Sequence, residues 1–175
     1  GPEMKSTGEV MGIGGEFGTA FAKAQIAAGN TLPTEGTVFV SVRDEDKDAV
    51  LPVARELQEL GFKIIATTGT KNFLNGNGVK AERVPKVIEG ERPNIVDRIK
   101  SGEVHAVINT SFGAQSVADS YSIRRSSVEL AVPYFTTVAG ARAAATGIKA
   151  ILKEKLDVST IQEYHALIQA SPIPR

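Results

Sequence analysis

The sequence predicts an α/β fold in which helices cover both faces of a parallel sheet. Apolar runs of strand length alternate with helix-like runs over most of the 175 residues, and the connections between them are short. The first strand-like run, residues 37–42, is apolar almost throughout, as expected of a strand covered on both faces. The hydrophobic share of 42% is enough for one well-formed core and hardly enough for two.

Each element has its own signal in the sequence. The expected strands cover residues 37–42, 62–66, 81–84, 103–109 and 133–137, with residues 81–84 short enough for a sheet edge. The expected helices cover residues 44–60, 71–74, 93–99, 116–131, 138–152 and 161–168. Pro52 has no backbone N–H, so we expect it in the first turn of a helix that properly begins near Asp48. Gly61 then ends that helix.

The beginning of the chain differs from the rest. Residues 1–4 resemble an expression remnant, and residues 7–15 are rich in glycine. Phe17, Ala20 and Phe21 then follow helical spacing. Residues 31–36 have the composition of a linker. We therefore expect a domain boundary after residue 36, with residues 37–175 forming the main domain.

Composition excludes several classes of partner. Twenty basic residues balance twenty acidic ones, so the chain lacks the positive charge that is typical of nucleic-acid binders. It contains no cysteine, so it has neither a disulfide nor a thiolate metal site, which suits a cytoplasmic protein. No apolar run reaches membrane-spanning length and no signal peptide is visible. We expect neither a nucleic acid nor a membrane as partner.

The segment at residues 66–71 indicates an anion pocket. It joins a strand-like run to a helix-like run and contains Thr67, Thr68, Gly69 and Thr70. We expect the glycine to allow a tight turn, and the helix N-terminus to offer free N–H groups and a positive dipole end. Thr67 and Thr70 would add hydroxyl donors. The alternative is an ordinary strand-to-helix turn in which a threonine caps the helix.

Further polar residues follow the other strands, and the carboxyl ends of parallel strands meet at one sheet edge. These residues are Arg43, Asp44, Lys47, Lys86, Asn109, Thr110, Ser111, Thr136 and Thr137. Together with the threonines they suit an anion that carries hydroxyls, such as a sugar phosphate or a mononucleotide. Taken singly, the lysines could be solvated and Asn109 could cap a turn. The sequence has no catalytic or metal-binding motif, and we expect His105, placed within a strand, to be structural.

These residues resemble a known family, the methylglyoxal synthase-like domains. Among them, the C-terminal allosteric domains of carbamoyl phosphate synthase large subunits are the most similar. The motifs that carry the resemblance lie at residues 40–47, 61–70, 86–90, 97–102, 108–110, 123–125 and 134–137. Residues 5–36 resemble the end of the preceding ATP-grasp synthetase domain with its linker. Compared with the pattern of that family, Glu91 looks like an extra residue in the loop that follows Lys86.

The resemblance implies a Rossmann-like three-layer sandwich with a central five-stranded parallel sheet. It also implies a shared site for UMP and IMP, and in some members a second site for ornithine. The implied phosphate-binding residues are Lys47, Thr67, Thr70 and Lys86, and the implied ribose- and base-binding residues are Ser41, Asn109, Thr110, Ser111 and Asp119. Tyr134 and Thr136 match the ornithine positions, although the carboxylates that complete that site lie outside this chain, so we expect weak ornithine binding.

The resemblance further implies a regulatory role in a larger ligase. That ligase makes carbamoyl phosphate for pyrimidine and arginine biosynthesis, uses ATP, Mg and K in its synthetase domains, and works with a glutaminase small subunit. The domain itself would need no cofactor or metal and could self-associate. The alternatives are a methylglyoxal synthase-type lyase acting on dihydroxyacetone phosphate and a purely structural oligomerisation domain. The lyase needs an aspartate base after the third strand, where this chain has Gly90, Glu91 and Arg92.

Overall fold

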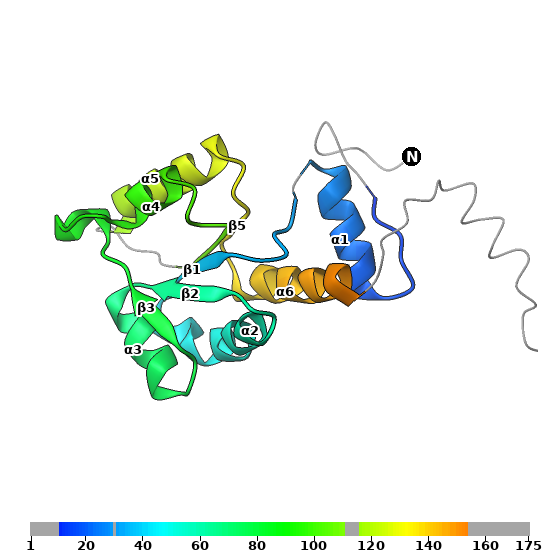
Figure 1. Cartoon of the computed structure of the whole chain (residues 1–175), viewed down its shortest axis with the longest axis horizontal. Helices are drawn as coiled ribbons and strands as arrows, with labels where there is room; N and C mark the ends of the chain where they lie inside the picture. Colours follow the sequence, from blue (N-terminus) through cyan, green and yellow to red (C-terminus); the bar gives the residue numbers. More distant parts are fainter. Residues whose placement is uncertain (1–10, 30, 111–115, 154–175) are drawn as a thin grey trace, which may run out of the picture.

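A five-stranded, all-parallel sheet forms the centre of the part that the structure describes (Figure 1). The structure is a computed structural model, and it describes residues 11–29, 31–110 and 116–153. The strands are β1 (Thr37–Ser41), β2 (Lys63–Ala66), β3 (Ala81–Arg83), β4 (Ala106–Asn109) and β5 (Tyr134–Phe135). Their order is β3-β2-β1-β4-β5, so the chain changes direction across the sheet between β1 and β4. Open parallel sheets bind ligands at such a switch point.

Helices lie on both faces of the sheet, which confirms the predicted fold class (Figure 1). One face carries α2 (Lys47–Glu59), α3 (Thr68–Gly76) and α6 (Val138–Lys153), and the other carries α4 (Ile95–Lys100) and α5 (Ser116–Glu129). Short 3₁₀ helices at Asp44–Asp46 and Val87–Glu89 precede α2 and α4. The helix expected at residues 161–168 lies outside the described residues.

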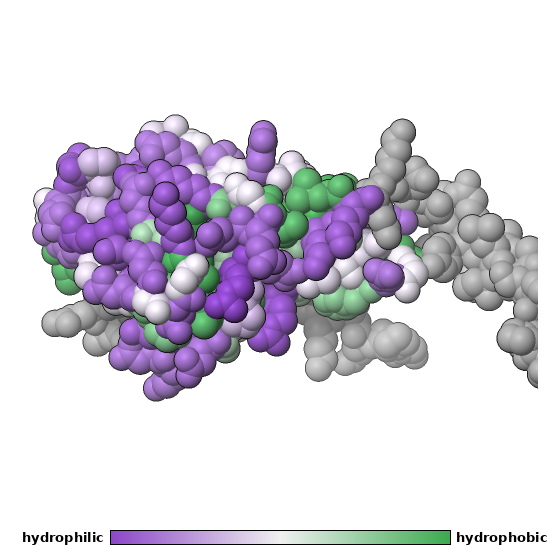
Figure 2. Space-filling view, turned by 60° about the horizontal axis from the view of Figure 1, so that its bottom comes forward, coloured by the Kyte–Doolittle hydropathy of each residue, from purple (hydrophilic) through white to green (hydrophobic). Residues whose placement is uncertain are grey.

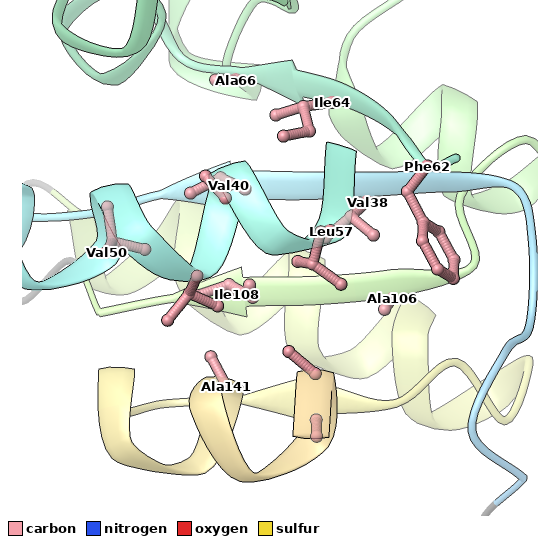
Figure 3. Packing of buried hydrophobic residues seen from close by; sticks show 14 of the residues in the cluster. Val38, Val40, Val50, Leu57, Phe62, Ile64, Ala66, Ala106, Ile108 and Ala141 are labelled. Atoms are coloured by element: carbon pink, nitrogen blue, oxygen red, sulfur yellow. The ribbon is translucent and has the colours of Figure 1, made fainter. Parts of the chain in front are cut away.

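Alternating side chains of the strands build two cores. Val38 and Val40 of β1 face α2 and α6 and pack with Ile64 and Ile108 of the neighbouring strands (Figure 3). Phe39 points to the opposite face and packs with residues of α4 and α5. Because Phe39 is fully buried, its replacement by alanine should cost roughly 3–5 kcal/mol of stability.

Two local expectations are wrong. Pro52 lies inside α2, which begins at Lys47, and therefore beyond the first turn. Pro52 and Asp48 are both exposed, so water can reach the carbonyl group that lacks a helical donor there. His105 does not lie within a strand, because β4 begins only at Ala106, and its side chain is exposed. Its Nδ1 accepts a hydrogen bond from the backbone N–H of Thr37 at 3.0 Å, which ties the starts of β4 and β1 together.

The first described helix, α1 (Phe17–Ala27), packs against α6 (Figure 1). Glycines allow the close approach: a Cβ at Gly147 would lie 3.0 Å from Leu32 and 3.1 Å from Phe21. Apolar side chains nevertheless remain exposed here, namely Met11, Phe17, Ile26 and Leu152. Figure 2 shows hydrophobic surface toward this end of the molecule. The boundary after residue 36 stays a prediction. Among the described residues no helix is long and apolar enough to cross a membrane.

Candidate functional site

The carboxyl ends of β1, β2 and β4 lie side by side and carry the predicted polar residues. Ser41 at the end of β1 is in register with Asn109 at the end of β4. The backbone N–H of Thr110 donates to the carbonyl oxygen of Ser41 at 3.0 Å. On the other side of β1, Val40 is in register with Ala66, directly before Thr67. The sheet register thus brings three of the expected strand ends to one place.

A pocket of about 420 Å³ opens at this edge. It contains five of the predicted ligand-binding residues: Ser41, Lys47, Thr67, Thr70 and Lys86. Val42, Asp44, Thr68, Gly69 and Glu89 complete the lining. The structure therefore brings all four predicted phosphate-binding residues together from three separate parts of the chain, which is the geometry that an anion site requires.

Three hydroxyl groups form a buried cluster at the base of the pocket. Ser41, Thr67 and Thr70 are only 3%, 6% and 2% exposed. The Thr67 hydroxyl donates to Ser41 Oγ at 3.3 Å and lies 3.4 Å from Thr70 Oγ1. Thr70 Oγ1 also accepts from the backbone N–H of Val42 at 3.2 Å. These contacts fix the hydroxyls between β1 and α3, so they are oriented before a ligand arrives.

The N-terminus of α3 faces the same pocket. Thr67 occupies the N-cap position, but its side chain makes no capping hydrogen bond, so the simple N-cap interpretation of this hydroxyl is wrong. Gly69 lies within the first turn of α3 and does not have a positive φ, so the expectation of a special tight turn is wrong as well. Its missing side chain instead leaves space beside Lys47, whose Nζ would lie 3.9 Å from a Cβ at Gly69.

Two lysines from different elements line the pocket. Lys47, at the start of α2, has a side chain that is 23% exposed and pairs with Asp44 Oδ1 at 2.6 Å. The Asp44 side chain is 92% exposed, and Lys47 lowers the pKa of its carboxyl group. A bound anion could replace this solvated carboxylate as the partner of Lys47. Lys86 also lines the pocket and lies in the loop after β3, directly before the short 3₁₀ helix Val87–Glu89.

The predicted ribose and base residues near β4 form an adjoining network. Asn109 is 5% exposed, and its side-chain N–H groups donate to Tyr134 Oη at 2.9 Å and to Ser120 Oγ at 3.3 Å. Burial raises the pKa of Tyr134, and the hydrogen bond from Asn109 opposes that rise. Thr110 Oγ1 accepts from the backbone N–H of Arg43 at 3.4 Å. Neither Asn109 nor Thr110 lines the pocket described above.

The other predicted site residues are placed less fully. The Tyr134 hydroxyl accepts a hydrogen bond from Asn109, whereas Thr136 is exposed, and neither residue lines the pocket. Ser111 and the side chain of Asp119 lie outside the described residues. Among the residues that the structure does describe, no group of three or more His, Asp or Glu side chains is arranged for a metal ion.

Sequence reasoning missed Glu89 as a lining residue and did not consider Arg83. Arg83 ends β3 and contacts both Glu89 and Thr68 of the pocket wall. Its position could have indicated a role at the site, because Arg83 is the last residue of β3 and the other polar groups follow the ends of the neighbouring strands.

Comparison with known proteins shows the family to which the sequence belongs. The MGS-like domain family matches residues 49–136. The chain is 51% identical over 172 residues to the carbamoyl phosphate synthase large chain of Myxococcus xanthus, covering 98% of this chain and 16% of that protein. It is 52% identical over 164 residues to the corresponding chain of Brucella suis, covering 94% of this chain and 14% of that protein. The chain thus spans only a small part of these relatives.

A solved structure supports the fold. Methylglyoxal synthase from Elizabethkingia anophelis superimposes with a TM-score of 0.52 over 82% of this chain and 95% of that protein. At 19% identity this likeness concerns the fold alone. Since the sequence match extends over half of the 175 residues, from residue 49 to residue 136, this chain belongs to the MGS-like domain family.

Proposed function

We propose that this chain is the nucleotide-binding regulatory region of a carbamoyl phosphate synthase large chain, with UMP or IMP as its effector. The observation that carries the proposal is the pocket in which buried Thr67 and Thr70 meet Lys47 and Lys86 beside the start of α3. Fixed hydroxyls, two ammonium groups and a helix N-terminus are complementary to a phosphate monoester. The similarity to large chains of this ligase supplies the biological context.

The neighbouring residues suit the remainder of a nucleotide. Ser41 lines the pocket, and across the switch point it is in register with Asn109, which Thr110 follows. In this proposal they contact the ribose and base together with Ser111 and Asp119. Tyr134 and Thr136 belong to a separate ornithine site, which binds weakly without the rest of the large chain.

Regulation follows from linkage. A nucleotide that binds one arrangement of this domain more tightly shifts the whole ligase toward that arrangement, typically with a coupling of ~1–3 kcal/mol. The parent carries the ATP-dependent chemistry, with Mg and K in its synthetase domains and a glutaminase small subunit as partner, while this region has no catalytic role. The exposed apolar residues of α1 and α6 suit contact with the preceding synthetase domain.

Calorimetric titration with UMP, IMP and dihydroxyacetone phosphate tests the proposal. We expect saturable UMP binding that is lost in Lys47→Ala and kept in Lys80→Ala, because exposed Lys80 does not line the pocket. A methylglyoxal assay on the same samples tests the lyase alternative. Turnover of dihydroxyacetone phosphate above background would contradict the regulatory assignment. Absence of binding by all three compounds would leave a structural role.

A further inference from the structure

Arg83 connects two walls of the pocket that lie on either side of β3 in the sequence. One wall is the first turn of α3, and the other is the loop that follows β3 and carries Lys86. We propose that Arg83 is a positioning residue that clamps this loop, residues 84–94, against α3 and thereby sets where Lys86 meets an anion. The proposal rests on the proposed function of the pocket.

The contacts use the whole guanidinium fork of Arg83. Its Nε donates to Thr68 Oγ1 at 3.1 Å, on the α3 wall. Its Nη1 and Nη2 donate to the two carboxylate oxygens of Glu91, each at 2.7 Å. Nη2 also donates to Glu89 Oε2 at 2.6 Å. Thr68 and Glu89 both line the pocket, so a single side chain spans its two walls.

Glu89 links Arg83 to the backbone of Lys86. While its Oε2 pairs with Arg83, its Oε1 accepts the backbone N–H of Lys86 at 2.9 Å. The short 3₁₀ helix Val87–Glu89 returns the chain so that the two residues meet, and the backbone N–H of Glu89 donates to the Lys86 carbonyl at 3.2 Å. The position of the Lys86 backbone is therefore linked to Arg83 through one carboxylate.

The loop carries a second acidic residue, Glu91, which is also a partner of Arg83. A second carboxylate beside an anion pocket should repel the ligand, yet Glu91 is held in a bidentate pair with Arg83. An isolated exposed ion pair stabilises little, but bidentate geometry within a network is the exception. Lysine could not make these contacts at once, because its ammonium lacks the planar fork.

Four variants test whether Arg83 acts by holding the loop or only by its positive charge. Arg83→Gln removes the clamp, Arg83→Lys keeps only its charge, and Glu91→Ala removes one partner together with a negative charge. Arg92→Gln is the matched control: it removes a positive charge from the same loop, and its side chain is 79% exposed with an acidic neighbour only at 3.8 Å. Each is titrated with UMP, and amide hydrogen exchange of the loop is measured without ligand.

We expect UMP affinity to fall about tenfold in Arg83→Gln and about threefold in Glu91→Ala, with Arg92→Gln close to wild type. Loop amides should exchange faster in both clamp variants. If only charge mattered, removing the negative charge in Glu91→Ala would tighten UMP binding. Tighter UMP binding by that variant therefore overturns the proposal. Full affinity in Arg83→Lys, or equal effects of Arg83→Gln and Arg92→Gln, also overturns it.

The exchange measurement separates this inference from the function on which it rests. If wild-type protein does not bind UMP, the proposed function fails. Faster loop exchange in Arg83→Gln than in Arg92→Gln then still supports the clamp. Unchanged exchange overturns the clamp whatever UMP does.

Discussion

Replacing Thr70 by valine tests the base of the pocket without changing its shape. Thr70 is 2% exposed, and its Oγ1 accepts the backbone N–H of Val42 at 3.2 Å and lies 3.4 Å from Thr67 Oγ1. Valine leaves that buried N–H without its side-chain acceptor, which should cost about 1–3 kcal/mol of unfolding free energy. The lost donor to phosphate should weaken UMP binding by about 1.5–3 kcal/mol, or roughly 10- to 150-fold.

Urea unfolding and calorimetry measure the two effects separately. Thr70→Ser is the control, because it keeps the hydroxyl and removes only a methyl group. We expect the serine variant to retain UMP affinity within about threefold while losing up to ~1 kcal/mol of stability. If Thr70→Val binds UMP as tightly as wild type at a temperature where it is fully folded, the hydroxyl does not contact phosphate and the assignment of this pocket is wrong.

Three further predictions concern charge, pH and packing. Asp44→Asn removes the carboxylate that competes for Lys47, so calorimetry should show UMP binding roughly two- to fivefold tighter; weaker binding would refute that competition. The hydroxyl of Thr110 and then Arg43 lower the pKa of Asp46 below its usual 3.8, so its stabilising contribution is present above that pH and is lost as the pH falls through the lowered value. Acid unfolding of Asp46→Asn should therefore depend less steeply on pH below about 4. Gly147→Val should cost about 1–3 kcal/mol by forcing α1 from α6, whereas Gly76→Val, with open space around its Cβ, should cost less than 1 kcal/mol in the same urea assay.

The layers of the fold could be predicted because their causes are local. Val38, Phe39 and Val40 are all apolar, and only a strand covered on both faces buries all three. The helices that cover such a strand were expected in the runs with helical spacing, such as residues 44–60. The details that failed also have physical reasons. Pro52 is tolerated inside α2 because that side of the helix is exposed.

The site was predictable where residues lie on the segments that follow the strand ends. Thr67, Thr70 and Lys47 come together because parallel strands deliver their carboxyl ends, and the helices that begin after them, to one edge. The Arg83 clamp was not predictable, since it depends on a loop that turns Glu89 and Glu91 back toward β3. Spacing along the sequence does not reveal such a return, and only the folded loop shows which carboxylates the guanidinium meets.

In the function proposed above, the pocket recognises the phosphate of a nucleotide. Titration of the wild-type chain with UMP and with uridine under identical conditions tests it most directly, because the two ligands differ only in the phosphate. We expect saturable heat with UMP and none with uridine at the same concentration. Equal binding of both ligands, or of neither, would contradict it.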